Sequence, residues 1–241
     1  MNRLTFRYLL VAAALVLVLA GSSSAARAAS RNDVSTAQCK MPGPVPAGCV
    51  VIVFDGDSIS AGIGAAPTDG LDAQFVRDLR VPARVYNVAV GGRPVFECLR
   101  LFGTTVAPLH DPAAPANLIV FHAGDNDIAQ GKSADETYRA FTEYVAAAHA
   151  QGWKIVVSTE LRRFAFSAER QAALEAYNQR LRANAAGADA VVDLDRDPRL
   201  AQPIERDDPA LFTKDRVHPS AGGYAVIAEL VAAAAKPLLP R

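Results

Sequence analysis

Ser58 is the residue whose type and surroundings best suit nucleophilic chemistry. It ends the run Asp55-Gly56-Asp57-Ser58, directly after the apolar segment 50–54. A serine hydroxyl is a weak nucleophile unless an adjacent base takes its proton. In a tight turn after a buried strand, which Gly56 would allow, Ser58 would be exposed at the edge of a sheet. Taken alone, Gly-Asp-Ser is better explained as an ordinary turn or helix cap.

A base for this serine is predicted far away in the sequence. Asp215 stands three residues before His218, and Pro219 follows at a position that the first turn of a helix tolerates. The Asp215 carboxylate could accept the Nδ1–H of His218, which fixes the tautomer and leaves Nε2 free to act on serine. A surface aspartate beside a capping histidine explains this fragment alone equally well.

The other three histidines have no such setting. His122 lies in an apolar run and is expected to be a strand residue facing a helix, whereas His110 lies in a Pro-rich loop and His149 on a helix. We therefore take His218 as the candidate base.

Ester chemistry also requires donors for the negative charge that develops on the carbonyl oxygen. Gly92 could offer its backbone amide, Asn126 its side-chain amide, and Ser58 its own backbone amide. Taken singly, a Gly-Gly turn and a loop asparagine are ordinary loop chemistry. Together they are candidates for an oxyanion hole.

The segments that must position these groups alternate between predicted strands and predicted helices. Five short apolar runs predict buried strands, and three longer stretches with apolar residues three and four apart predict helices. The strands are Val50–Phe54, Arg84–Val90, Leu118–His122, Lys154–Ser158 and Ala190–Leu194, and the helices are Ala134–Ala150, Ala168–Ala185 and Ala221–Ala235. The alternation predicts a parallel sheet in a three-layer α/β/α sandwich.

The candidate residues fall where such a sheet binds ligands. Open parallel sheets bind beyond the carboxyl ends of their strands. Polar, Gly-containing turns follow the first three predicted strands, at 55–58, 91–92 and 123–127. These turns are expected to meet at one edge.

Four blocks, in this order, resemble those of the SGNH hydrolases, also called GDSL-type esterases and lipases. The family's F-x-GDS-[LI]-[ST]-x-G-x-G block resembles 54–64, its N-x-[GA]-x-[SG]-G block resembles 87–92, its GxND block is matched by 124–127, and its DxxHP block by 215–219. The resemblance covers essentially the whole chain after the N-terminal segment.

The resemblance implies a flavodoxin-like sandwich around a five-stranded parallel sheet. It further implies Ser58 as nucleophile, His218 as base, Asp215 as its orienting carboxylate, and Gly92 and Asn126 beside the Ser58 amide in the oxyanion hole. Acyl transfer to Ser58 and hydrolysis of the acyl-enzyme would need no metal or cofactor. The expected partner is a small-molecule ester.

One dipeptide departs from the family's pattern, and two phenylalanines lie outside the four blocks. Arg93-Pro94 replaces the Asp-Thr that follows the second block in many relatives, so Arg93 either biases the site toward anionic or polar substrates or is a solvated loop arginine. Phe164 and Phe166 either line the pocket or pack against the next helix.

The N-terminus predicts export. Arg3 and Arg7 precede an apolar run that is too short to span a bilayer, and Ala26-Arg27-Ala28 offers a cleavage site. We predict a signal peptide over 1–28, a lead-in segment over 29–48 and an SGNH hydrolase domain over 49–241, with a secreted or periplasmic location and no stable membrane anchor.

Charge and cysteine content further limit the class of protein. Basic and acidic residues balance at 25 each, which argues against nucleic-acid binding. Cys39 and Cys49 flank a Pro- and Gly-rich loop and could form a disulfide, which would leave Cys98, but the sequence does not fix the pairing. Oligomeric state is left open.

Three other functions compete with a serine esterase. In a metal-dependent phosphoesterase, Asp55, Asp57, Asp125, Asp127 and His218 would ligate the metal. A non-catalytic glycan- or lipid-binding module could use the same scaffold. An O-acyltransferase would share the first half-reaction and replace water with a sugar hydroxyl.

Overall fold

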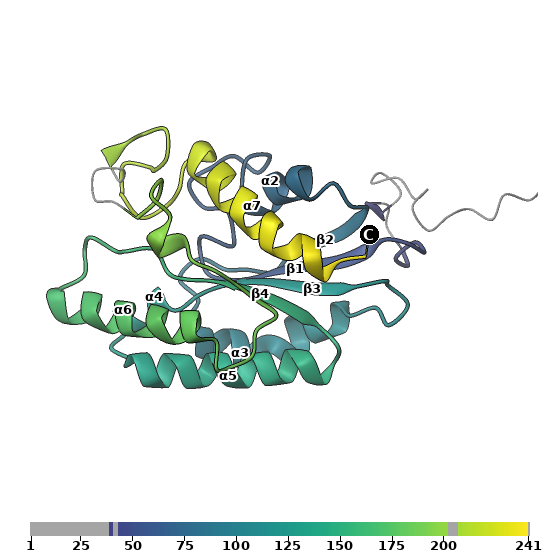
Figure 1. Ribbon diagram of the computed structural model, residues 1–241, viewed down its shortest axis with the longest axis horizontal. Coiled ribbons are helices and arrows are strands. Elements are labelled where there is room, and N and C mark those ends of the chain that lie inside the picture. The colour runs from purple at the N-terminus through teal and green to yellow at the C-terminus, as the bar shows by residue number, and fades with distance from the viewer. Residues whose placement is uncertain (1–38, 41–42, 202–206, 241) are drawn as a thin grey trace, which may run out of the picture. The chain divides into compact units, whose positions relative to one another are not determined.

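Five strands form one parallel sheet in the order β2-β1-β3-β4-β5 (Figure 1). They are β1 (Val50–Gly56), β2 (Ala83–Asn87), β3 (Asn117–His122), β4 (Lys154–Ser158) and β5 (Ala190–Val192). The predicted five-stranded parallel sheet is confirmed. Strand β2 lies on one side of β1, and β3, β4 and β5 follow on the other side. The order in which strands are added therefore reverses between β1 and β3, and sheets of this kind bind ligands at such a point.

The structure, a computed structural model, describes residues 39–40, 43–201 and 207–240. The predicted signal peptide over 1–28 lies outside the described residues, as does much of the lead-in segment over 29–48.

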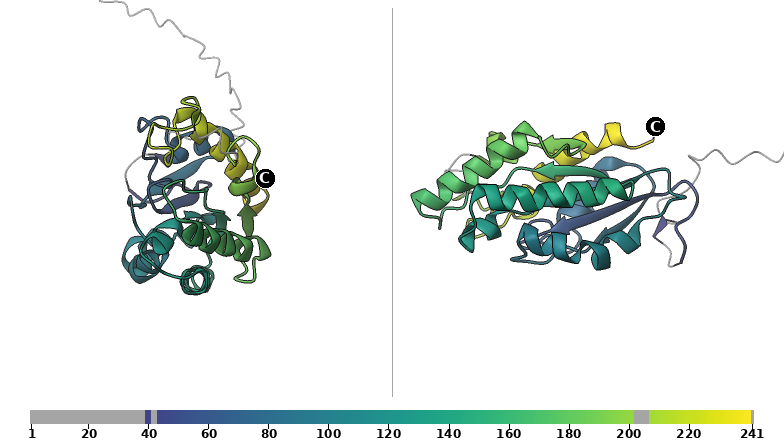
Figure 2. Two further views of the ribbon diagram at one scale, coloured as in Figure 1. Left: turned by 90° about the vertical axis from the view of Figure 1, so that its left-hand side faces the viewer. Right: turned by 90° about the horizontal axis from the view of Figure 1, so that it is seen from below.

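Helices cover both faces of the sheet, as Figures 1 and 2 show. On one face lie α2 (Leu71–Leu79) and α7 (Ala221–Ala235), and on the other α3 (Val95–Thr105), α5 (Ala134–Ala150) and α6 (Ala168–Ala183). The shorter elements are α4 (Asp125–Ala129) and the 3₁₀ turns η1 (Ala107–Leu109), η2 (Leu194–Arg196) and η4 (Lys236–Leu238). This is the predicted three-layer sandwich.

Strand β1 shows why the apolar runs are continuous. Val50, Ile52 and Phe54 pack into the core beneath α2 and α7, whereas Val51 and Val53 pack into the core on the α3 and α5 side, and all five are fully buried. Burying each such side chain stabilises the fold by about 1.5–3 kcal/mol. A strand that is covered on both faces therefore does not alternate between apolar and polar residues.

The helix ends follow from local hydrogen bonding. Ser133 and Glu136 form a capping box at the start of α5, which spans the predicted range. Helix α7 also matches its prediction. Helix α6 ends two residues before the predicted Ala185, because Asn184 adopts a left-handed conformation with φ 52° and closes the helix.

Two predicted strands are too long. Strand β2 ends at Asn87 rather than Val90, although the Val88 and Val90 N–H groups still donate to the β1 carbonyls of Phe54 and Gly56. At this end the Asn87 Oδ1 accepts the Ala89 N–H at 3.2 Å and its Nδ2 donates to the Ser60 carbonyl at 2.9 Å. Strand β5 ends at Val192, and Leu194 begins η2 instead.

The cysteine pairing left open by the sequence is defined. Cys39 and Cys49 form a disulfide, and Cys98 is a free, buried thiol on α3. Burial raises the pKa of the Cys98 thiol, so this cysteine behaves as an apolar core residue.

Helix α7 with the turn after it, Ala221–Leu238, is apolar and long enough to cross a membrane by length and composition. Its residues Tyr224, Ile227 and Val231 are buried in the core that α7 shares with α2 and the sheet. We therefore interpret its apolarity as that of a core helix.

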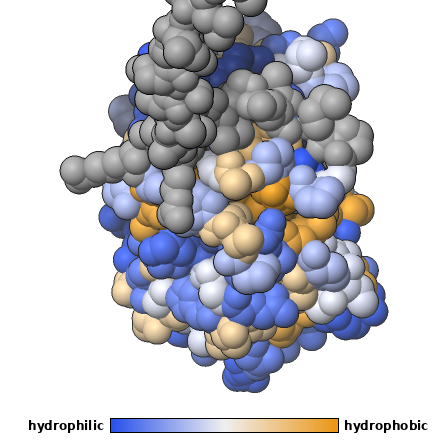
Figure 3. Space-filling view, turned by 90° about the vertical axis from the view of Figure 1, so that its right-hand side faces the viewer, coloured by the Kyte–Doolittle hydropathy of each residue, from blue (hydrophilic) through white to orange (hydrophobic). Residues whose placement is uncertain are grey.

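At the end of the molecule where β1 begins, the surface carries apolar residues among hydrophilic ones (Figure 3).

Candidate active site

The turn that holds Ser58 is fixed against the end of β3. The Asp57 N–H donates to the His122 carbonyl at 3.0 Å, and a Cβ on Gly56 would overlap that same carbonyl, so only glycine fits there. The Asp57 carboxylate accepts the Ile59 N–H at 2.9 Å. Ser58 itself is half-buried. The nucleophile candidate thus stands on a rigid turn at the carboxyl end of β1.

Asp215 and His218 form the pair expected from their spacing. The His218 Nδ1 lies 2.6 Å from the Asp215 Oδ2, while the Asp215 Oδ1 accepts the backbone N–H groups of Val217 and His218 and the Thr213 hydroxyl. Partial burial tends to raise the pKa of Asp215, but these hydrogen bonds outweigh it and hold that pKa well below its ordinary value. Asp215 is therefore an anion that orients the His218 ring.

The Ser58 loop and the His218 loop touch. A Cβ on Gly64 would lie 3.0 Å from the His218 Cβ, and the Tyr224 hydroxyl donates to the Ile63 carbonyl at 2.7 Å. Within the described residues no hydrogen bond joins the Ser58 hydroxyl to the His218 ring. Such bonds often tighten only when substrate is bound, so the two side chains are brought to one place rather than locked together.

Gly92 lies beside Ser58 in the turn after β2. The Arg93 N–H donates to the Val90 carbonyl at 3.1 Å, Gly92 has φ +77°, and nothing lies within 4 Å of the position a Cβ would take there. A Cβ on the preceding Gly91 would lie 3.8 Å from the Ser58 Cβ. Gly92 is therefore next in sequence to a residue that lies beside the nucleophile candidate, and its Cβ position is unobstructed.

Asn126, the third donor candidate, follows β3 in the first turn of α4. Its Nδ2 lies 3.4 Å from the Asp57 Oδ2, and its Oδ1 lies 3.5 Å from an Arg163 nitrogen. The polar turn predicted at 123–127 is thus the start of a short helix. Asp127 in the same helix accepts the Val95 N–H at 2.7 Å and so ties α4 to the start of α3.

Arg93 does not line an open pocket. Its side chain is buried, and one guanidinium nitrogen donates to the Asp55 Oδ1 at 3.1 Å and to the Val88 carbonyl at 2.9 Å. The Tyr144 hydroxyl donates to the other Asp55 oxygen at 2.8 Å. Both sequence-based explanations of Arg93, a substrate-selecting residue and a solvated loop arginine, are wrong: it neutralises a buried aspartate.

We therefore expect Arg93→Met to lower the free energy of unfolding by about 3 kcal/mol, because it leaves the buried Asp55 carboxylate unpaired. Burial already raises the pKa of Asp55, so the loss should shrink in acid, where the carboxyl is neutral. Urea unfolding at two pH values measures this. The control is Arg77→Met, whose exposed pair with Asp69 contributes at most about 1 kcal/mol. Equal losses in the two variants would contradict the assignment.

The sequence missed a group of buried ionisable side chains beneath this site. His122 lies with its Nδ1 2.7 Å from the Ser158 Oγ and its Nε2 3.2 Å from the Glu160 Oε2, while Arg163 pairs with Asp125 at 3.0 Å. His122 is a strand residue as expected, but it faces carboxylates rather than a helix. The signal was present, since Glu160 and Arg163 follow β4 as Ser58 follows β1.

Phe164 and Phe166 both lie against arginines. The guanidinium of Arg163 is 5.3 Å from the Phe166 ring centroid, and that of Arg216 is 4.6 Å from the Phe164 ring centroid. Such stacking is worth about 0.5–1 kcal/mol at exposed sites. Each of the two rings thus lies against a basic side chain.

The metal site considered from the sequence does not form. Asp55 is bound to Tyr144 and Arg93, Asp127 caps α3, and His218 pairs with Asp215. Of the proposed ligands, only Asp57 belongs to a group with metal-like spacing in the described chain: its carboxylate, His122 and Glu160 have ligand atoms within 4.8 Å of one another.

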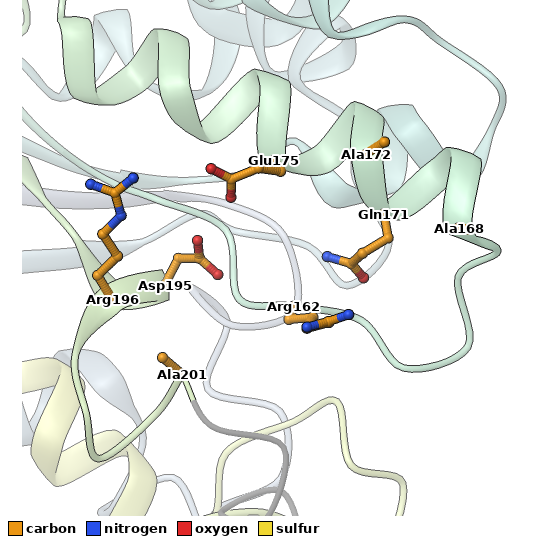
Figure 4. A pocket seen from close by; sticks show the side chains of 8 residues that line it. All are labelled: Arg162, Ala168, Gln171, Ala172, Glu175, Asp195, Arg196 and Ala201. Carbon is orange, nitrogen blue, oxygen red and sulfur yellow. The ribbon is translucent and has the colours of Figure 1, made fainter.

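A separate cavity of about 670 Å³ lies between α6 and η2 (Figure 4). Charged side chains from both elements reach into it, and its lining consists of Arg162, Ala168, Gln171, Ala172, Glu175, Asp195, Arg196 and Ala201. None of these is a predicted catalytic residue. One of the lining residues, Arg162, lies in the segment that follows β4.

Solved structures share this fold. A lipolytic protein of the G-D-S-L family from Veillonella parvula has 21% identity and a TM-score of 0.59, covering 79% of this chain and 98% of its own. The acetyl xylan esterase AlAXEase has 20% identity and a TM-score of 0.61, covering 76% and 98%. TesA has 20% identity and a TM-score of 0.60, covering 78% and 99%. The sequence matches no curated protein.

Residues 54–226 match the GDSL-like Lipase/Acylhydrolase family, and the chain belongs to that family. The resemblance found in the four sequence blocks is thereby confirmed. Members of this family are ester-hydrolysing enzymes, and this chain is one of them.

Proposed function

We propose that this enzyme is an exported serine esterase that cleaves small or short-chain carboxylic esters through an acyl-enzyme on Ser58. The observation that carries the proposal is the Asp215–His218 pair, which lies against the loop of a serine on a rigid turn. Asp215 fixes the ring through Nδ1, so Nε2 is the nitrogen available to the Ser58 hydroxyl.

In the first half-reaction, His218 takes the Ser58 proton as the Oγ attacks the ester carbonyl, and the imidazolium then gives that proton to the leaving alcohol. The carbonyl oxygen becomes an anion, which the Ser58 and Gly92 amides and the Asn126 side chain would receive. In the second half-reaction, His218 activates a water that releases the acid and frees Ser58. Neither half-reaction uses a metal or a cofactor.

The described residues with large, exposed apolar side chains are Ile63, Val90 and Phe96. Ile63 and Val90 lie in the turns after β1 and β2, and Phe96 lies in the first turn of α3 that follows. A Cβ on Gly91 would lie 2.8 Å from the Ile63 Cδ1 and 3.8 Å from the Ser58 Cβ. Ile63 thus places an exposed apolar side chain beside the nucleophile candidate, which suits the acyl part of a small ester.

Export fits this proposal. The N-terminal segment has the charge, apolar run and cleavage site of a signal peptide, and the disulfide between Cys39 and Cys49 persists in oxidising compartments. We propose a secreted or periplasmic location. Amino-terminal sequencing of the protein recovered from its native host, expected to begin near Ala29, tests it.

The test of function is hydrolysis of p-nitrophenyl acetate, butyrate and octanoate, combined with mass spectrometry after exposure to a serine-directed phosphonate. We expect turnover that falls with chain length, is insensitive to chelator and stops when one phosphonyl group is attached to Ser58. Labelling without ester hydrolysis, but with acyl transfer to an added sugar, would identify an acyltransferase. Loss of activity with chelator would contradict a metal-free mechanism.

We expect Asn126→Ala to lower kcat about 10²–10³-fold, because it removes one donor to the developing oxyanion. KM for p-nitrophenyl acetate should change little, since the donor acts on the transition state rather than on bound substrate. Steady-state kinetics measure both constants, and phosphonate labelling should show that Ser58 stays reactive. A fully active variant would remove Asn126 from the oxyanion hole.

A further inference from the structure

The buried group around His122 brings together side chains from three strand ends. Asp57 follows β1, Asp125 follows β3, and Glu160 follows β4. His122, Asp57 and Glu160 are each 1% exposed, and the Glu160 peptide is clamped on both sides by the Asn178 side chain at 2.8 Å. A fully buried set of ionisable groups is costly unless its charges and hydrogen bonds are matched within it.

The group is joined directly to the proposed catalytic atoms. The Asp57 N–H donates to the His122 carbonyl at 3.0 Å, and Ser58 is the next residue. On the other side, the Asn126 Nδ2 lies 3.4 Å from the Asp57 Oδ2. A shift of His122 or Asp57 would therefore move two proposed oxyanion donors together, the Ser58 amide and the Asn126 side chain.

The charges can balance without an added cation. Burial, with the neighbouring carboxyl groups of Glu160 and Asp125, raises the pKa of Asp57, and burial with Glu160 raises that of Asp125, which favours a proton on one of the two aspartates. The remaining negative charge on the two aspartates faces the Arg163 guanidinium, which lies 3.0 Å from Asp125, and Glu160 faces the His122 ring. An imidazolium at His122 would donate its Nδ1–H to the Ser158 Oγ at 2.7 Å and would form an ion pair, rather than an aligned hydrogen bond, with Glu160, whose Oε2 lies 3.2 Å from Nε2.

We propose that protonated His122 is a positioning residue for the oxyanion hole. By pairing with Glu160 and facing Asp57, it holds the Ser58 turn and the Asn126 side chain in place. The proposal rests on the proposed function. It goes beyond it by assigning a role to a histidine that touches neither substrate nor nucleophile.

The pH dependence follows from the groups that face His122. Burial lowers its pKa, but Glu160, Asp57 and Asp125 outweigh burial and raise the pKa to about 9. Arg163 pairs with Asp125, and the Tyr177 hydroxyl on α6 is held by the Ala123 carbonyl. In an unfolded chain a histidine has a pKa of about 6.5. The proton therefore stabilises the fold fully below about pH 6.5, and this stabilisation is lost as pH rises through about 9.

The first experiment is NMR titration of the folded enzyme with labelled imidazoles, in which His122→Gln identifies the His122 signals among the four histidines. We expect His122 to be protonated at pH 7 with a midpoint near 9, and kcat for p-nitrophenyl acetate to fall over the same range. Glu160→Gln should move both midpoints down by about one pH unit or more, because it removes an opposite charge. It should also lower kcat by up to about a hundredfold with little change in KM.

The matched control is Asp189→Asn at an exposed pair, where the His149 Nε2 lies 3.0 Å from the Asp189 Oδ2. This variant should leave kcat and its pH profile as in the parent enzyme. Glu160→Asp, which keeps the charge, should restore the alkaline midpoint in part. A role in folding alone would lower stability without moving the pH profile.

Several results would overturn the proposal: a neutral His122 ring at pH 7, a kcat that stays flat to pH 10, or a Glu160→Gln enzyme with the parent's kcat and profile. If Glu160→Gln does not fold, the first two results decide from the parent protein alone. One equivalent of tightly bound divalent metal would also overturn it, since the group would then be a metal site. An equally active Ser58→Ala would overturn the proposed function as well, whereas an inactive Ser58→Ala beside an unaffected Glu160→Gln overturns only this proposal.

Discussion

Ser58→Ala is expected to lower kcat for p-nitrophenyl acetate about 10⁶-fold, the loss seen when the nucleophile of a serine hydrolase is removed. The reason is chemical, because without the Oγ no acyl-enzyme forms and the His218 base has no hydroxyl to activate. The fold should be unaffected. Ser58 is half-buried, and no hydrogen bond of its hydroxyl to another described residue holds the turn together. Kinetics and urea unfolding of the mature protein measure the two effects.

Ser60→Ala is the matched control for this result. Ser60 lies two residues away on the same turn and is buried, with its hydroxyl 3.5 Å from the His122 carbonyl. It should keep most of the activity, because it faces β3 rather than the open edge. Equal rates in the parent and Ser58→Ala would contradict the acyl-enzyme mechanism, and equal losses in both variants would point to a damaged turn rather than a missing nucleophile.

The sequence predicted the sheet well because its strands are buried on both faces. Runs such as Val50–Phe54 have only one environment that suits them, and the five strands occur where those runs lie. Strand ends were less predictable. Val88 and Val90 have strand-like side chains, and their N–H groups still donate to the β1 carbonyls of Phe54 and Gly56. The regular strand nevertheless ends before them, at Asn87, so the side-chain pattern extends past the end of the strand.

Some contacts of the candidate site could likewise be predicted from the sequence, and others could not. The Asp215–His218 pair was predictable because its geometry is set within four residues. The contacts of Arg93 with Asp55 and of His122 with Glu160 join residues 38 positions apart, and only the strand order brings them together. From the sequence alone, a loop arginine such as Arg93 is expected to be solvated, because the buried Asp55 that it contacts is distant in the sequence. Long-range ion pairs of this kind leave no periodic signal in one sequence.

Asp215→Asn is expected to lower kcat about 10⁴-fold while the protein stays folded. Asp215 accepts the Nδ1–H of His218 at 2.6 Å and two backbone N–H groups of the same loop. An asparagine can keep the backbone bonds through its oxygen and then presents its NH₂ group to the ring. The His218 Nδ1 must then become an acceptor, which places the proton on Nε2, the atom that should take the Ser58 proton.

Thr213→Val separates this tautomer effect from simple loosening of the loop. It removes the hydroxyl that donates to the Asp215 Oδ1 at 2.7 Å but leaves the carboxylate facing the ring, so kcat should fall far less, by about tenfold or under. Nitrogen NMR of labelled His218 should show a proton on Nδ1 in the parent and in Thr213→Val, and on Nε2 in Asp215→Asn. If Asp215→Asn kept the parent's tautomer and rate, another group would have to orient His218. Because its hydrogen bonds hold the pKa of Asp215 well below its ordinary value, loss of this anion should not limit activity at mildly acidic pH.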